Sequence, residues 1–170
     1  AAEDTRKTRR LLDRYGIRTP MTSYYEHNKM TKLAYLLRFL DTEDLALVSE
    51  AGMPGISDPG YEIVAAAAKR GIRVVPIPGA SAIPAAVAVS GLPTDQFTYL
   101  GFLPRKKSER IHLLQQVSRE PRTLVAFEAP HRIVEALGDL LSVLGDRKIA
   151  NVRELTKLHE ECIPGTVSSL

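Results

Sequence analysis

The order of apolar and polar positions divides this chain into short strands and amphipathic helices. Leucines at positions 33, 36, 37 and 40 lie on one face of a helix, which predicts a helix over residues 29–40. The same reasoning predicts further helices over residues 5–15, 61–70, 81–90, 108–118 and 131–144. It predicts strands over residues 45–48, 72–75, 97–102, 122–128 and 148–153.

The stretch of residues 45–60 organises the rest of the chain. Its apolar run, 45–48, suits a strand buried on both faces, and a loop rich in glycine and proline follows at once. Residues 72–91 repeat this order of strand, glycine–proline turn and helix. Two such units predict a parallel sheet with both loops at one edge, where open α/β folds bind ligands. Neither loop has a GxGxxG or GxxxxGK[ST] pattern, so spacing alone supports a ligand site and a plain turn about equally.

The pattern changes after the turn signal LPTD at residues 92–95. We therefore expect two small α/β lobes, over residues 1–92 and 93–170. Junctions between lobes are favoured places for ligand clefts.

The composition narrows the class of protein. Of the 170 residues 44% are hydrophobic and 25% are charged, which is ordinary for a globular protein. The single cysteine, Cys162, excludes a disulfide framework and fits a reducing compartment. No apolar run is long enough to cross a bilayer, and no signal peptide opens the chain. We expect a cytoplasmic protein without a membrane partner.

Positive charge is concentrated in two places. Residues 1–38 hold nine Lys or Arg against four acidic residues, and a second cluster lies at residues 105–110. Such patches favour a polyanion, and nucleic acid in particular, although charged helix faces are often only solvated.

No residues have the spacing of a metal site, and no GxSxG nucleophile motif occurs. Polar residues instead gather where predicted strands end, at Glu3, Asp4, Glu50, Asp58, Glu128, His131, Arg132, Arg153, Glu154, Thr156 and Lys157. Each has a structural alternative: Asp58 could equally cap the next helix, and Arg153 could equally pair with Glu154. For His131, capping or anion binding is favoured over a role as a base.

Several strings taken together resemble one family: EDTR (3–6), SYYEHN (23–28), ALVSEAGMPGISDPGY (46–61), GIRVVPIPGASA (71–82), SGLPTDQF (90–97), GFLPRK (101–106), EAPHR (128–132) and RELTK (153–157). The chain resembles the 2′-O-ribose methyltransferases of small-subunit ribosomal RNA, a branch of the tetrapyrrole methylase superfamily. The match runs in order over nearly the whole chain. Any one of these strings alone would be a weak signal.

The resemblance implies a two-lobed α/β fold with a parallel sheet in the N-terminal lobe and a mixed sheet in the C-terminal lobe. It implies S-adenosyl-L-methionine in a cleft between the lobes, a homodimer, and methylation of a cytidine ribose in 16S ribosomal RNA. Members of the family begin with a further strand and continue with more of the second sheet. We therefore expect a chain truncated at both ends, whose own activity is left open.

The resemblance also assigns residues. Backbone contacts to the cofactor are implied for Ala51, Gly52, Met53, Pro54, Gly55, Pro78, Gly79, Ala80, Ser81, Ala82, Leu103, Pro104, Ala129 and Pro130. Contacts to RNA are implied for Arg6, Arg10, Arg105, Lys106, Arg132 and Arg153. For the reaction itself we expect a catalytic group of Glu3 or Asp4 with Glu154 as acids around the acceptor, and Lys157 to bind phosphate or offset charge, with no metal required.

Methyl transfer to a ribose hydroxyl needs the oxygen held in line with the methyl group and a base to take its proton. Three alternatives compete with the RNA enzyme: a methyltransferase for a tetrapyrrole or another small molecule, a nucleotide- or RNA-binding module without turnover, and a nicotinamide-dependent oxidoreductase. The basic clusters argue against the first, and the missing GxGxxG pattern argues against the third.

Overall fold

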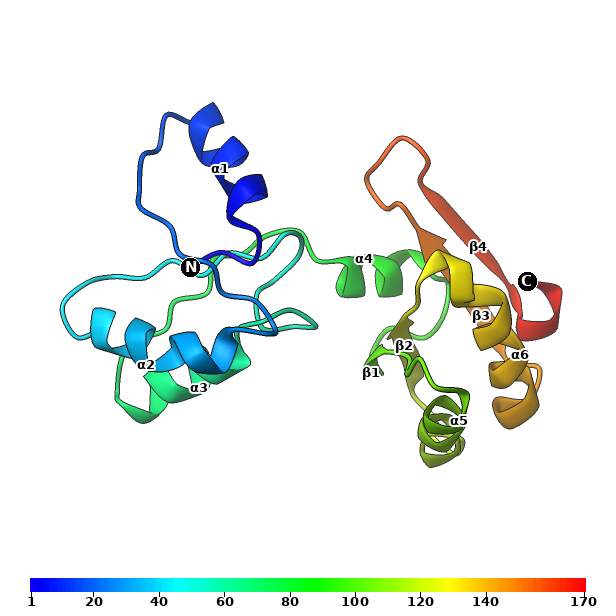
Figure 1. The fold of residues 1–170 in the computed structure, drawn as a ribbon. Helices are drawn as coiled ribbons and strands as arrows, with labels where there is room; N and C mark the ends of the chain where they lie inside the picture. The colour runs from blue at the N-terminus through cyan, green and yellow to red at the C-terminus, as the bar shows by residue number, and fades with distance from the viewer. The chain divides into compact units, whose positions relative to one another are not determined.

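A computed structural model describes residues 1–170 and divides into two compact units, Ala1–Ser81 and Ala82–Leu170 (Figure 1). The first unit contains the helices α1 (Thr5–Arg14), α2 (Lys29–Phe39) and α3 (Tyr61–Lys69). The second contains α4 (Ala82–Val89), β1 (Phe97–Phe102), α5 (Lys107–Gln116), β2 (Thr123–Phe127), η1 (Pro130–Arg132), α6 (Ile133–Leu144), β3 (Lys148–Arg153), β4 (Glu161–Thr166) and η2 (Val167–Ser169). No helix has the length and apolar character needed to cross a membrane.

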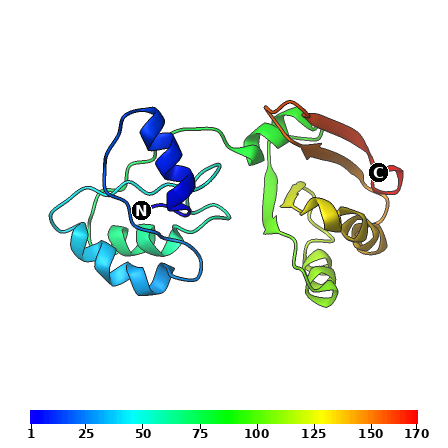
Figure 2. The same ribbon diagram turned by 45° about the horizontal axis from the view of Figure 1, so that its top comes forward.

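The core of the first unit lies between α2 and α3, which are side by side in both views (Figures 1 and 2). Tyr24, Leu36 and Ile63 are buried together, with Leu33 and Leu47 packed against them. The leucine spacing therefore predicted both the helix and its buried face. Because these apolar side chains come from separate segments, they hold the loops of this unit against its helices.

The parallel pairing in the first unit is less extensive than predicted. Ala2 forms isolated parallel bridges to Ser23 and Val48, and no longer ladder follows. The strand predicted over residues 72–75 does not form: this segment is extended and unpaired, with Val74 and Val75 about half exposed. The prediction is wrong there because β-branched residues favour an extended backbone but do not supply a neighbouring strand.

The second unit holds the regular sheets, and its mixture of pairings confirms the α/β class. Strands β1 and β2 are parallel, with a break in register between Tyr99 and Phe102, beside Gly101 at φ +72°. Strands β3 and β4 are antiparallel (Figure 2). Strand β4 was not predicted because it contains Pro164 and Gly165. Proline is tolerated there because a two-stranded sheet consists only of edge strands.

The structural division precedes α4, whereas the predicted domain boundary follows it, at LPTD. Cys162 donates a hydrogen bond from Sγ to the carbonyl of Val89 at 3.4 Å, which connects the end of α4 to β4. This contact between distant parts of the chain gives no local signal in the sequence. The predicted domain boundary after Leu92 therefore stays a prediction.

Candidate functional site

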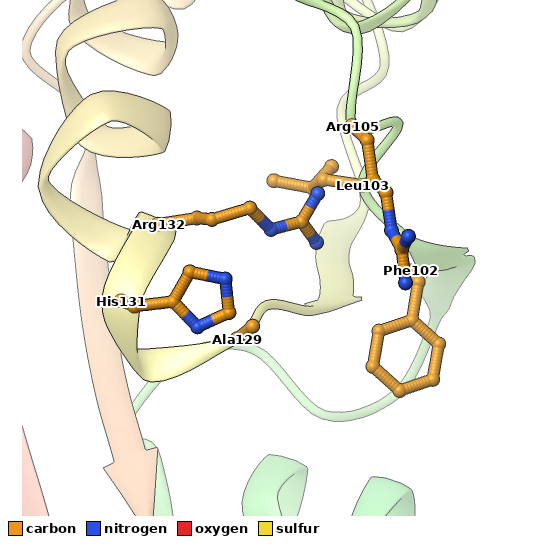
Figure 3. A pocket seen from close by; sticks show the side chains of 6 residues that line it. All are labelled: Phe102, Leu103, Arg105, Ala129, His131 and Arg132. Carbon is orange, nitrogen blue, oxygen red and sulfur yellow. The ribbon is translucent and has the colours of Figure 1, made fainter.

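An open hollow of about 520 Å³ lies in the second unit, where β1 and β2 reach their carboxyl ends. Its lining consists of Phe102, Leu103, Arg105, Ala129, His131 and Arg132. Figure 3 shows the side chains of His131 and Arg132 extending from one wall toward Phe102 and Arg105 on the other. Parallel α/β sheets place ligands at this edge. The hollow brings together residues predicted for the cofactor with residues predicted for RNA.

The wall formed by β1 is fixed by backbone and aromatic contacts. The N–H of Leu103 donates to the carbonyl of Phe127 at 3.0 Å, which holds the segment after β1 beside the end of β2. The rings of Phe102 and Phe127 lie 5.2 Å apart between centroids. Leu103 is buried at the floor, while 57% of Phe102 remains exposed. The hollow therefore has an apolar floor and an accessible aromatic ring.

A buried arginine fastens the loop that carries Arg105. Arg110 is fully buried, and its Nη1 donates to the carbonyls of Pro104 at 3.1 Å and Arg105 at 3.4 Å. Its other nitrogens donate to Asp139 and Glu135 of α6, each at 2.7 Å. The backbone of residues 104–105 is thus held by a residue outside the hollow.

The opposite wall is held by an ion pair between Glu128, which follows β2, and Arg132, which ends η1. Glu128 Oε1 accepts from Arg132 Nη2 and from the N–H of Ala129. Both side chains are largely enclosed, and both Glu128 Oε2 and Arg132 Nη1 are buried without a hydrogen-bond partner. Buried polar atoms of this kind call for an explanation, and a bound ligand is one.

The hollow holds one permanently charged side chain without an ion pair, that of Arg105. Arg132 is paired with Glu128, whereas neither Arg105 nor His131 forms an ion pair. Both are exposed. The arrangement therefore suits an anionic group.

In the first unit, the loop over residues 51–55 leaves bare backbone accessible. Gly52 and Gly55 have φ of +73° and +83°, and no atom lies within 4 Å of a Cβ placed on Gly52 or on Gly79. A ligand could therefore approach the main chain at both bends, which fits the contacts implied for the cofactor. No hydrogen bond joins residues 51–55 to residues 78–81. The structure leaves both bends open to a ligand.

Asp58 supports this loop and does not cap the following helix. The N-cap of α3 is Gly60, without a side-chain hydrogen bond. Burial raises the pKa of Asp58, with Glu50 adding to the effect, while a hydrogen bond with Ser49 opposes it. Ser49 Oγ also lies 3.2 Å from the carbonyl oxygen of Ala51, which is the alternative acceptor for its hydroxyl. Asp58 and Ser49 therefore link the two ends of the glycine loop.

Two residues predicted to be catalytic, Glu3 and Asp4, are engaged in local structure. Asp4 caps α1 by accepting from the N–H of Arg6 at 2.8 Å and of Lys7 at 3.3 Å. The hydrogen bonds from Arg6 lower the pKa of Asp4, which makes it a weak proton acceptor. Glu3 Oε2 accepts from the N–H of Glu50 at 3.2 Å.

The other two, Glu154 and Lys157, lie in the turn between β3 and β4. Lys157 Nζ lies 3.1 Å from Glu154 Oε1, and Glu154 has φ +51°. Arg153 pairs with Glu161, so the predicted alternative of a pair with Glu154 is not formed. The structure brings Glu154 and Lys157 together at an exposed turn.

The residues predicted to contact RNA differ in whether they already form an ion pair within the chain. Arg10 on α1 and Arg105 form no ion pair, whereas Arg6 pairs with Asp4, Lys106 with Glu109 and Arg132 with Glu128. The two free cations are therefore the more available for phosphate.

Sequence reasoning left Phe102 out of the site, and it named His131 as a candidate for capping or anion binding without placing it among the cofactor or RNA contacts. Phe102 ends a strand correctly predicted over residues 97–102, but strand alternation does not reveal which exposed aromatic borders a hollow. His131 had a usable signal, its place after Pro130 in a short helical turn.

Taken together, these features define an α/β protein with ligand-accessible loops at the ends of its strands. Residues 2–170 match the family described as Tetrapyrrole (Corrin/Porphyrin) Methylases, and the chain belongs to this family.

Curated relatives of this chain share one name within the family. The chain is 49% identical over 168 residues to "Ribosomal RNA small subunit methyltransferase I" of Halalkalibacterium halodurans, covering 98% of this chain and 58% of the relative. It is 50% identical to the protein of that name from Xylella fastidiosa, covering 99% and 63%. The one from Thermotoga maritima is 46% identical, with 98% and 75% covered. These names confirm the resemblance to small-subunit ribosomal RNA methyltransferases. The chain spans less than two thirds of the length of the first two relatives.

Proposed function

We propose that this chain is part of a methyltransferase that uses S-adenosyl-L-methionine to methylate small-subunit ribosomal RNA. The observation that carries the proposal is an identity of 46–50% over nearly the whole chain to relatives that share one name. The basic hollow and the bare glycine loop support it, because they suit an anionic substrate and a ligand bound through the backbone.

The finer proposal is that the acceptor is the 2′-hydroxyl of a cytidine ribose. When bound, the cofactor supplies an electrophilic methyl group. The ribose hydroxyl that would accept this group has to give up its proton, either to a carboxylate of this chain or to water. This chain has to orient the oxygen and receive or pass on that proton.

Among the four residues predicted to be catalytic, Glu3 and Glu154 are the better candidates for proton acceptors. Asp4 is less suited because its pKa is lowered by the hydrogen bonds of the α1 cap. Lys157, paired with Glu154, would hold that carboxylate in place or offset its charge. These roles remain proposals.

We propose that the cofactor contacts the backbone of residues 51–55 and 78–82. The support is the open space in front of Gly52 and Gly79. Leu103, Pro104, Ala129 and Pro130 stay as proposed cofactor contacts of the second unit.

Helix α1 supplies a second support for an RNA substrate. Its first turn has no acidic residue, and Arg6, Lys7, Arg9 and Arg10 lie among its first six residues. Cations at this end oppose the helix dipole, and only Arg6 and Lys7 offset this with ion pairs, to Asp4 and Glu50. Binding of a phosphate backbone gives them a function, with Arg10 free of any ion pair.

We further propose that the protein acts as a homodimer in the cytoplasm, where small ribosomal subunits are made. The unpaired thiol of Cys162 suits that reducing compartment. Light scattering coupled to size exclusion tests the dimer directly, since a mass near that of one 18.7 kDa chain would contradict it.

The decisive experiment is transfer of a labelled methyl group from S-adenosyl-L-methionine to small ribosomal subunits or to their RNA. We expect the label in RNA, at a nucleotide whose 3′ bond resists alkali, as a 2′-O-methyl ribose requires. Labelling of a porphyrinoid instead would indicate the small-molecule acceptor. Binding of RNA and S-adenosylhomocysteine without transfer would indicate a module without turnover. Binding of NAD without S-adenosylhomocysteine would overturn the proposal altogether.

A further inference from the structure

We propose that Lys29, at the start of α2, is a positioning residue for the loop over residues 51–60. It acts through Glu62, in the first turn of α3, rather than by contact with a ligand. The inference rests on the proposed function, in which the backbone of residues 51–55 contacts S-adenosyl-L-methionine. It adds the contact that keeps this loop in shape before the cofactor binds.

The loop ends against the N-terminus of α3. Gly60 is the N-cap of this helix, and no side chain caps it. A Cβ on Gly60 would lie 2.8 Å from the backbone nitrogen of Gly55 and 3.1 Å from Cδ2 of Leu47. The bare main chain at Gly60 therefore packs directly on the main chain at Gly55. Because this contact leaves no spare room, a shift of the first turn of α3 must either move Gly55 or open the contact.

Lys29 fastens this first turn of α3 to the start of α2. Its Nζ lies 2.6 Å from Oε1 of Glu62 and 2.8 Å from Oε1 of Glu26. The side chains of Lys29 and Glu62 are each 22% exposed, whereas that of Glu26 is 66% exposed. Opposite charges attract more strongly where water is partly excluded. We therefore expect the contact with Glu62 to be the stronger of the two.

The turn that carries Lys29 is itself fixed. Oδ1 of Asn28 accepts from the N–H of Tyr25 at 2.8 Å, and its Nδ2 donates to the carbonyl of Ser23 at 3.3 Å. The N–H of Lys29 donates to the carbonyl of Tyr25 at 2.9 Å. A group that is held beforehand loses less conformational freedom when it binds a partner, so Lys29 is well placed to hold Glu62 in one position.

The opposite end of the same two helices supplies a matched control. Arg70, the C-cap of α3, donates from Nη1 to the carbonyl of Leu37 at 2.8 Å and pairs with Asp41. This contact also joins α3 to the α2 region, but it lies at the far end of a nine-residue helix, about 13 Å along the axis from the first turn. Breaking it should cost stability without moving the loop.

The experiment measures binding of S-adenosylhomocysteine by titration calorimetry and stability by urea denaturation in the same variants. Lys29→Met removes the charge and keeps an unbranched side chain, and Glu62→Gln removes the partner on α3. We expect each to weaken binding roughly 2- to 30-fold, the range for residues that modulate a site without touching its ligand. Lys29→Arg keeps the charge and should bind as wild type does.

Two control variants separate positioning from a general loss of stability. Glu26→Gln removes the other ion pair of Lys29, and Arg70→Gln breaks the contact at the far end of α3. Both should bind S-adenosylhomocysteine as wild type does, whatever stability they lose. An unchanged affinity in Lys29→Met, or an equal loss of affinity in Arg70→Gln, would overturn the inference.

Hydrogen exchange of the ligand-free chain gives a readout that does not depend on the function. Amides within residues 51–60 should exchange faster in Lys29→Met than in wild type, and not in Arg70→Gln. If they do so while the wild-type chain binds no S-adenosylhomocysteine, the proposed function fails and the positioning role stands. If the wild-type chain binds it, and neither the exchange nor the affinity changes in Lys29→Met, the positioning role is wrong and the function stands.

Discussion

Arg110 and Asp139 form an ion pair in the interior of the second unit. Nε of Arg110 donates to Oδ2 of Asp139 at 2.7 Å, and neither side chain is more than 6% exposed. Removing one member of such a pair leaves a buried charge without compensation. The pair also connects α5 to α6 beneath the loop that carries Arg105, so the stability of this unit and the shape of the hollow depend on the same contact.

The first prediction follows from the burial of the ion pair between Arg110 and Asp139. Arg110→Ala should lower the free energy of unfolding by about 3–5 kcal/mol, because Asp139 would remain buried and would keep only the exposed Lys107 as a charged partner. Urea denaturation measures the change. Lys107→Ala is the matched control: this lysine lies 3.5 Å from Asp139 but is mostly exposed, and we expect a loss below about 1 kcal/mol. Equal losses in the two variants would contradict the assignment.

A double-mutant cycle tests the pair of Glu128 and Arg132. Arg132→Ala alone should destabilise the fold by about 2–4 kcal/mol, since the Glu128 carboxylate would keep only the N–H of Ala129. Adding Glu128→Ala should recover part of this loss, because no buried charge remains. Chemical denaturation of the four proteins gives the coupling energy. Strictly additive losses would show that the two side chains do not interact in solution.

The basic face of α1 makes a prediction about salt. If Arg10 and Arg14 each contact a phosphate, replacing either by Gln should reduce the slope of log affinity for single-stranded RNA against log salt by about 0.7. Arg6→Gln should have a smaller effect, because Arg6 is already paired with Asp4. Fluorescence anisotropy at several salt concentrations measures these slopes. A slope that stays at the wild-type value in Arg10→Gln would remove α1 from the RNA surface.

Asp58 gives a prediction about pH. Burial raises its pKa, so the folded chain binds this proton more tightly than the unfolded chain does. Its contribution to stability is therefore present at low pH and is lost as the pH rises through the folded pKa. Asp58→Asn should gain in stability relative to wild type as the pH increases from acid to neutral. Thermal melts over that range measure the difference.

The variant Ser49→Ala tests the hydrogen bond that opposes the raised pKa of Asp58. It removes the hydrogen bond that favours the charged form of Asp58, so it should make the loss of stability with rising pH larger. A smaller pH dependence in Ser49→Ala than in wild type would show that burial is not what controls Asp58.

The two glycines at the ends of the loop should respond differently to alanine. A Cβ on Gly60 would lie 2.8 Å from the backbone nitrogen of Gly55, whereas one on Gly52 meets nothing within 4 Å. Gly52→Ala should cost only the left-handed backbone, about 1–2 kcal/mol. Gly60→Ala should cost a further 1–3 kcal/mol or so from the clash. Denaturation curves measure both, and titration calorimetry with S-adenosylhomocysteine shows whether the methyl group on Gly52 blocks the ligand.

Local patterns were enough to predict most helices and three of the four strands in the second unit. The helix over residues 29–40 and the strands over 97–102 and 148–153 follow from the spacing of side chains that meet neighbours close in sequence. Strand β4 and the unpaired segment over 72–75 could not be predicted in this way. Strand pairing depends on partners elsewhere in the chain, and these leave no local signal.

The site was only partly predictable for a similar reason. The strings around Leu103, Arg105, Ala129 and Arg132 indicated a ligand site, and these residues do line one hollow. The sequence did not show that Arg110 is fully buried or that Asp4 is occupied by the cap of α1. Such roles depend on which partner each charged side chain reaches, and residue type alone does not decide that.

The unpaired segment over residues 72–77 affects how the protein behaves in concentrated solution. Val74, Val75 and Ile77 expose apolar side chains on an extended backbone, which is the kind of surface from which aggregates grow. Arg73 and Pro76 interrupt it with a charge and with a residue that has no N–H. Two residues outside the core and outside the proposed site therefore disfavour strand pairing between this segment and a second copy of the chain.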